Sequence, residues 1–126
     1  MFIWSVSDPS RLDEQTRVAV GAPENQVLVS GVTAWEIAIK HALERFKFPI
    51  DRFDDVMQRM GFDVLPILPI HAITAGGLPR HHDDPFDRML VAQARVEGLT
   101  LVSSDLAVAR YDVSILGGDG AVATAR

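Results

Sequence analysis

The chain has 126 residues, 48% of them apolar, with a formal net charge of −5 and no cysteine. These values predict one domain with a hydrophobic core and exclude disulfides, zinc thiolates and a cysteine nucleophile. No apolar run approaches the roughly 18 residues of a membrane helix and no secretory signal opens the chain, so we expect a cytoplasmic protein with no membrane partner. The acidic charge argues against a broad basic nucleic-acid footprint. Acids could still face a basic partner protein, or attract phosphate through a divalent metal.

Strand-like and helix-like segments alternate along the sequence. Short β-rich runs predict four strands, the second near a sheet edge because it contains a proline, at 26–30, 63–67, 99–103 and 113–116. Apolar side chains at helical spacing predict helices between them, at 33–45, 50–60, 69–76, 84–97 and, for one or two turns, 106–111. This alternation predicts an α/β domain over 1–116, with a mostly parallel sheet and helices on both faces. The Gly-rich segment 117–126 is expected to be a flexible tail.

The best-defined predicted helix begins at Asp84. Asp84 is a good N-cap, Pro85 suits the first helical position, and Gly98 suits the position after the last turn. Asp87 then falls in the first turn, where the helix dipole favours an acid by roughly 0.3–1 kcal/mol. That purely structural role is compatible with a functional one, since Asp84 and Asp87 are three apart and point to the same side of the helix start.

Ligands of a parallel α/β sheet bind beyond the carboxyl ends of its strands. Asp105 follows the predicted strand 99–103 and lies at that edge, although it would serve equally well as N-cap of the next short helix. Glu36 lies one helical turn after the predicted strand 26–30, in an apolar setting. The plainer interpretation of Glu36 is a solvent-facing pair with Lys40, worth a few tenths of a kcal/mol.

Acids gathered at one sheet edge would repel one another and have raised pKa values unless a cation neutralised them. Mg²⁺ or Mn²⁺ suits such a cluster, because both prefer carboxylate and water oxygens. Other chemistries find less support. His81 and His82 read as a polar loop without ligand spacing, Ser103 and Ser104 lack a base partner, and the glycines form no phosphate-binding motif.

Three segments together resemble a known family. Residues 29–40, with Ala34-Trp35-Glu36-Ile37-Ala38-Ile39-Lys40, resemble the second conserved block of PIN-domain ribonuclease toxins of the VapC type, which belong to type II toxin–antitoxin systems. Residues 78–94, with Asp84-Pro85-Phe86-Asp87-Arg88-Met89-Leu90-Val91-Ala92-Gln93-Ala94, resemble the third, and residues 101–105 resemble the fourth. Their order and spacing agree, and the third block is long enough to be specific.

The resemblance implies a PIN-like three-layer α/β/α sandwich and Mg²⁺- or Mn²⁺-dependent hydrolysis of RNA phosphodiester bonds. It assigns the catalytic metal site to Glu36, Asp87 and Asp105. Asp84 is a further candidate ligand, and Arg88 a candidate substrate contact. It also implies a cognate antitoxin protein as partner, and homodimers are usual in the family.

The chain departs from the family pattern at its start. Such toxins usually begin with a short apolar strand ending in an Asp, whereas residues 1–12 match the helix and loop that follow it. Pattern alone would make residues 1–6 a strand, but the alignment argues against that, and Asp8 falls in the later turn. The resemblance therefore implies that the first strand and its Asp are missing.

Such a loss would leave unpaired backbone groups at the sheet centre and remove one usual carboxylate from the metal site. A start codon assigned too late would explain it, and so would a degenerate copy. The alternative function is therefore a catalytically inactive PIN-like remnant that only binds an antitoxin. A third interpretation is a DNA-directed or flap nuclease of related fold.

Overall fold

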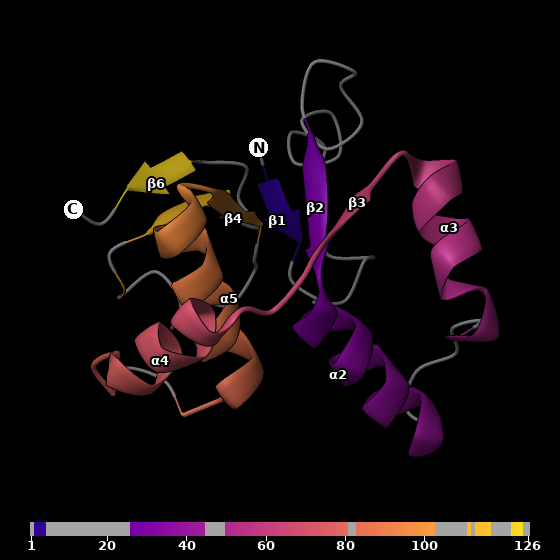
Figure 1. Ribbon diagram of the computed structural model, residues 1–126, viewed down its shortest axis with the longest axis horizontal. Coiled ribbons are helices and arrows are strands. Elements are labelled where there is room, and N and C mark those ends of the chain that lie inside the picture. Colours follow the sequence, from indigo (N-terminus) through magenta and orange to yellow (C-terminus); the bar gives the residue numbers. More distant parts are fainter. Residues whose placement is uncertain are drawn as a thin grey trace.

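The structure is a computed structural model that describes residues 2–4, 26–44, 50–80, 83–102, 111, 113–116 and 122–124; for 2–4, 114–116 and 122–124 it describes the backbone alone. Its strands form one sheet in the order β3-β2-β1-β4-β5-β6 (Figure 1). All neighbouring strands pair in parallel except β5 and β6, which are antiparallel. The strands are β1 Phe2–Trp4, β2 Val27–Ser30, β3 Asp63–Leu65, β4 Thr100–Val102, β5 Ser114–Leu116 and β6 Val122–Thr124.

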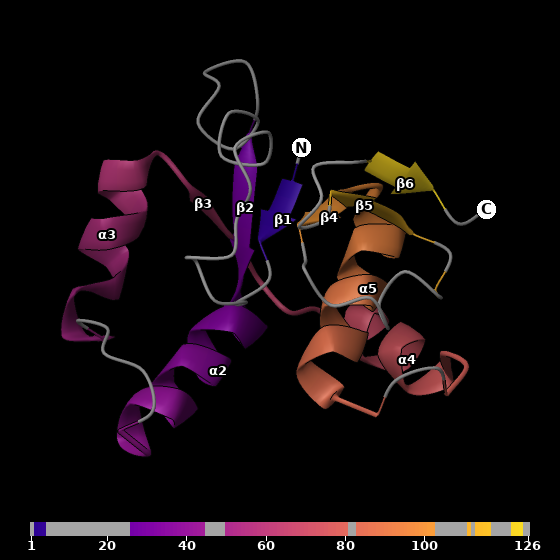
Figure 2. The same cartoon turned by 180° about the vertical axis from the view of Figure 1, so that it is seen from behind.

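The described helices follow the predicted segments closely. They are α2 Gly31–Ala42, the short 3₁₀ helix η2 Ile50–Arg52, α3 Phe53–Met60, α4 Pro69–Gly77 and α5 Pro85–Glu97. Helix α4 packs beside α5, while α3 lies beyond the β3 edge of the sheet (Figures 1 and 2). The predicted α/β class with a mostly parallel sheet is confirmed, and β3 is the edge strand that Pro66 indicated.

The expectation that the first strand is missing is wrong. Residues Phe2–Trp4 form β1 at the centre of the sheet, with Ile3 opposite Leu28 of β2 on one side and opposite Leu101 of β4 on the other. Two physical reasons favour this pairing: aromatic and β-branched residues suit strands, and a gap between β2 and β4 would leave backbone groups of both strands unpaired. The segment is therefore a strand, although its sequence resembles a helix of the family pattern.

Two further expectations concern the C-terminal part of the chain. Val122–Thr124 lies in the segment expected to be a flexible tail, and it forms strand β6, antiparallel to β5. The short helix predicted near 106–111 falls mostly outside the described residues.

The core lies mainly against α5. Leu90, Val91, Ala92 and Ala94 of this helix are each at most 1% exposed. They pack with other buried side chains, namely Leu28, Val32, Ala75, Leu78, Leu99, Leu101, Tyr111 and Val113. Packing of α5 in the core therefore holds the residues at its start in place. Among the described helices, none has the length and apolar character needed to cross a membrane.

Candidate active site

Helix α2 starts at the point where β2 ends. The side chain of Ser30, the last residue of β2, accepts a hydrogen bond from the backbone N–H of Val32 at 3.0 Å and caps the helix. The strand therefore turns into the helix without a loop. Ile37 is buried, and the side chain of the neighbouring Glu36 is only 12% exposed. Glu36 is thus held one turn beyond the carboxyl edge of the sheet, as expected.

The Glu36 carboxylate combines a predicted contact with an unexpected burial. Its Oε2 atom lies 3.4 Å from Lys40 Nζ, so the plain i,i+4 pair is present. Yet the acid does not face solvent. Burial raises the pKa of Glu36 and the negative charge of Asp84 adds to the rise, while the charge and hydrogen bond of Lys40 oppose it. Lys40 therefore compensates the acid only in part.

Asp84 fixes the start of α5 as the sequence predicted. Its Oδ1 accepts hydrogen bonds from the backbone N–H groups of Phe86 at 2.8 Å and Asp87 at 3.2 Å. Gly98 ends the helix in the left-handed conformation, at φ 67°, which glycine adopts without a Cβ penalty. These caps are confirmed, and they hold Asp84 where its charge acts on Glu36.

An aromatic contact joins the starts of α2 and α5. The ring centroids of Trp35 and Phe86 lie 5.1 Å apart at an interplanar angle of 70°, an edge-to-face arrangement. Trp35 precedes Glu36, while Phe86 lies between Asp84 and the half-buried Asp87. The contact therefore brings the acid of α2 and the acids of α5 to the same part of the molecule, and the sequence analysis did not anticipate it.

The Arg88 side chain has a structural role that the sequence analysis missed. Its guanidinium donates hydrogen bonds to the carbonyl oxygens of Ala75 at 2.9 Å, Leu78 at 3.0 Å and Pro79 at 3.1 Å. It also donates to the Tyr111 hydroxyl at 3.3 Å. Arg88 thus satisfies carbonyls at the end of α4, which a helix terminus leaves without helical partners. Its predicted contact with substrate stays a prediction.

The described residues include Glu36, Asp84 and Asp87 from the set of acids that the resemblance assigns to a metal site. Within them, no group of three His, Asp or Glu side chains is placed to hold a metal, and Asp105 lies outside the described residues. The donor chemistry nevertheless fits a hard cation. Glu36 and Asp84 offer carboxylate oxygens, and a desolvated carboxylate with another negative charge nearby gains stability from a bound Mg²⁺ or Mn²⁺.

Comparison with models of known protein families assigns most of the chain to one family. The family model described as PIN domain matches residues 1–114. The matched stretch contains β1, the acids Glu36, Asp84 and Asp87, and the segment with Asp105. No curated protein matches the chain.

Proposed function

The chain belongs to the PIN domain family, and from this premise we propose that it is a metal-dependent endoribonuclease that hydrolyses RNA phosphodiester bonds. PIN domains are generally metal-dependent nucleases. The observation that carries the proposal for this chain is the partly compensated Glu36 carboxylate, buried beside the charge of Asp84 at the carboxyl edge of the sheet. A cation at that place would relieve both the burial and the repulsion.

In this proposal Glu36, Asp87 and Asp105 hold Mg²⁺ or Mn²⁺, with Asp84 as a further ligand. When bound, the ion supplies positive charge that polarises the scissile phosphate and eases deprotonation of the attacking water. Glu36 or Asp105 would orient that water. Asp84 keeps the first turn of α5 fixed while this happens.

We further propose that the chain is the toxin of a toxin–antitoxin pair and is blocked by a cognate antitoxin protein. The support is the sequence resemblance of residues 29–40 and 78–94 to VapC-type toxins. An antitoxin needs a surface to bind, and α4 offers exposed apolar side chains, with Ile70 51% and Ile73 73% exposed. A homodimer is proposed on the same resemblance.

The competing function, an inactive remnant that only binds an antitoxin, drew support from a missing first strand and a missing acid. Because β1 pairs with β2 and β4, the first of these grounds no longer applies. The second concerns a single carboxylate. Catalysis by the remaining acids is therefore the function we test.

The test is cleavage of RNA with Mg²⁺ or Mn²⁺ by the wild-type chain and two variants. Asp87→Asn replaces the acid at the third position of α5, and Asp55→Asn replaces the acid at the third position of α3, which is exposed and remote from the site. We expect cleavage to be lost in Asp87→Asn and kept in Asp55→Asn. Equal cleavage by Asp87→Asn and wild type would contradict the assignment. Cleavage of DNA but not RNA would instead indicate a DNA-directed nuclease.

A further inference from the structure

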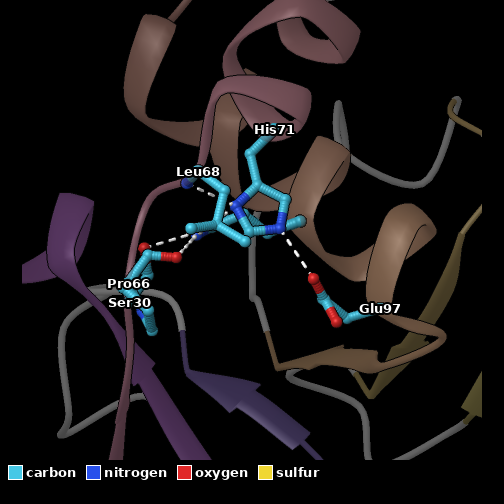
Figure 3. Close-up of polar contacts among 6 residues, drawn as sticks. Ser30, Pro66, Leu68, His71 and Glu97 are labelled. Atoms are coloured by element: carbon cyan, nitrogen blue, oxygen red, sulfur yellow. Dashed lines mark hydrogen bonds and ion pairs between the residues drawn. The ribbon is translucent and has the colours of Figure 1, made fainter.

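A buried hydrogen-bond network links β2 to α5. The side chains of Ser30 and Gln93 are both 0% exposed, and the Ser30 hydroxyl donates a hydrogen bond to Gln93 Oε1. The same hydroxyl oxygen accepts from the N–H of Val32 and so caps α2. At its other end the Gln93 amide donates from Nε2 to the carbonyl oxygen of Pro66, at 3.3 Å. Ser30 and Pro66 face this network in Figure 3.

His71 extends the network toward the start of α4. It is also 0% exposed. Its Nδ1 atom accepts a hydrogen bond from the Leu68 N–H at 2.9 Å, so the ring proton resides on Nε2 and is directed to Glu97 Oε1 at 2.8 Å (Figure 3). Gln93 Nε2 lies 3.4 Å from the same Nδ1 atom. The segment between β3 and α4 is thereby fixed against α5.

The partners of Gln93 leave only one orientation for its amide. The Ser30 hydroxyl already accepts from Val32, so its own proton needs an acceptor, and the Gln93 oxygen supplies it. The opposite side faces the Pro66 carbonyl oxygen, which needs a donor. A flipped amide would place its oxygen against the Pro66 carbonyl oxygen and take away the acceptor of the Ser30 proton. The donors and acceptors of the network therefore allow only one orientation of the Gln93 amide.

Packing alone does not account for a glutamine at this position. Its neighbours on α5, Leu90, Val91, Ala92 and Ala94, are buried and apolar, and an apolar side chain of similar size would fill the space without burying an amide. A fully satisfied polar network in a core instead specifies one arrangement of the elements that it joins. Here the joined elements are α2 and α5.

Those two helices carry the acids of the site. Ser30 caps α2 six residues before Glu36, and Gln93 lies six residues after Asp87 on α5. The Trp35–Phe86 contact joins the same helices at a second point. A single contact would let the helices pivot about it, whereas two separate contacts restrict how they can rotate relative to each other. The same two contacts therefore hold α2, which carries Glu36, against the start of α5, which carries Asp84 and Asp87.

We propose that Gln93 is a positioning residue of the metal site: through Ser30 it locks α2 to α5 and so sets the distance between Glu36 and the acids of α5. This inference rests on the proposed function. Gln93 does not touch the metal or the RNA, and its effect is carried entirely by the two helices. Groups hydrogen-bonded directly to metal ligands typically change metal affinity by roughly 10-fold to 100-fold when they are lost, and Gln93 acts one step further away, so its effect should lie at the lower end of that range.

The test is a titration of the folded, full-length chain with Mn²⁺, in which electron paramagnetic resonance measures the concentration of free ion. The titration is done well below the unfolding temperature of each variant. Gln93→Met removes the amide and keeps the side-chain size, and Ser30→Ala removes the hydroxyl from the other end. Met57→Ala is the matched control, because it opens a cavity at a buried residue of α3, away from both contacts.

We expect Gln93→Met and Ser30→Ala each to weaken Mn²⁺ binding about tenfold. The double variant should bind no more weakly than the weaker single variant, since both remove the same bond. Met57→Ala should lower the unfolding temperature and change Mn²⁺ affinity less than about twofold. Wild-type Mn²⁺ affinity in a destabilised Gln93→Met or Ser30→Ala would overturn the positioning role and leave the proposed function standing. Absence of Mn²⁺ binding to the wild type would overturn the proposed function itself.

Discussion

Two polar neighbourhoods lie along the contact between α2 and α5, and they are built on opposite principles. Ser30, Gln93 and His71 are fully buried, and the amide and ring nitrogens have hydrogen-bond partners. Around Glu36 the group is charged and partly buried, and Lys40 only partly offsets the cost of that burial. The first neighbourhood has its hydrogen bonds satisfied within the protein, whereas Glu36 in the second is only partly compensated by Lys40.

Rigidity and reactivity are therefore located in different neighbourhoods of the molecule. A satisfied network stabilises one arrangement of helices, while an undercompensated acid is costly in the free protein and favourable only when a cation arrives. Substitutions in the two neighbourhoods should therefore have different effects. Damage to the Gln93 network should appear first as lost stability, and damage at Glu36 should appear first as lost activity.

The largest expected effect is on catalysis and comes from a substitution of Glu36. Glu36→Gln should lower metal-dependent RNA cleavage by at least about a hundredfold, because the charge that a metal supplies to the transition state is worth several kcal/mol and each 1.36 kcal/mol is tenfold in rate. Single-turnover cleavage rates measure the change, with Asp55→Asn as the unaffected control. A Glu36→Gln rate within a few-fold of wild type would remove Glu36 from the site.

The next largest effect is on the free energy of unfolding and comes from a substitution of Gln93. Gln93→Leu should lower the free energy of unfolding by about 1–3 kcal/mol, because the buried Ser30 hydroxyl loses its acceptor. Urea unfolding followed by circular dichroism measures it. A double-mutant cycle with Ser30→Ala should give a coupling energy of roughly 0.5 kcal/mol or more. Strictly additive losses would mean that the two side chains do not act as one unit.

A smaller effect of opposite sign is expected from Glu36→Gln on the metal-free protein. Because burial raises the pKa of Glu36 above 4.5 in the folded state, the protonated acid stabilises the fold below pH 4.5, and this contribution is lost as pH rises through the raised pKa. Glu36→Gln, which is neutral at every pH, should therefore be the more stable protein near pH 7, and the difference should vanish toward low pH. Urea unfolding at several pH values checks this, and a constant difference would contradict it.

The smallest effect concerns Lys40. Its side chain is 41% exposed, and an exposed i,i+4 pair contributes only about 0.2–0.5 kcal/mol. Lys40→Gln should therefore change the free energy of unfolding by no more than that amount, while the pKa of Glu36 rises further because its opposing charge is gone. Nuclear magnetic resonance of the Glu36 side-chain carboxyl carbon follows the titration. An unchanged pKa would show that Lys40 does not compensate the acid.

The sequence predicted those features that arise from local chemistry. Asp84, Pro85 and Gly98 mark the ends of α5 because caps and glycine conformations involve residues a few positions apart. The placement of Glu36 after β2 followed from the same local rules. These signals sufficed for the fold class and for bringing Glu36 and Asp84 to the same edge.

Features that depend on distant partners were beyond such rules. Ser30 and Gln93 are 63 positions apart, and nothing near either residue announces the other. Arg88 likewise reads as a surface charge until α4 folds against α5. The error over β1 has another cause, because the apolar run Phe2–Trp4 indicated a strand, whereas the resemblance of residues 1–12 to a later part of the family pattern argued against one. Pairing with two neighbouring strands decides the outcome in the structure.

The most direct test of the account compares wild type and Glu36→Gln in urea unfolding with and without saturating Mn²⁺ near pH 7. Without the ion, the account predicts that Glu36→Gln is the more stable, since its side chain carries no buried charge. With the ion, it predicts that the order reverses, because binding to the native state stabilises the wild type more. The same order in both conditions, with equal or no stabilisation of the two proteins by Mn²⁺, would contradict the claim that Glu36 belongs to a metal site.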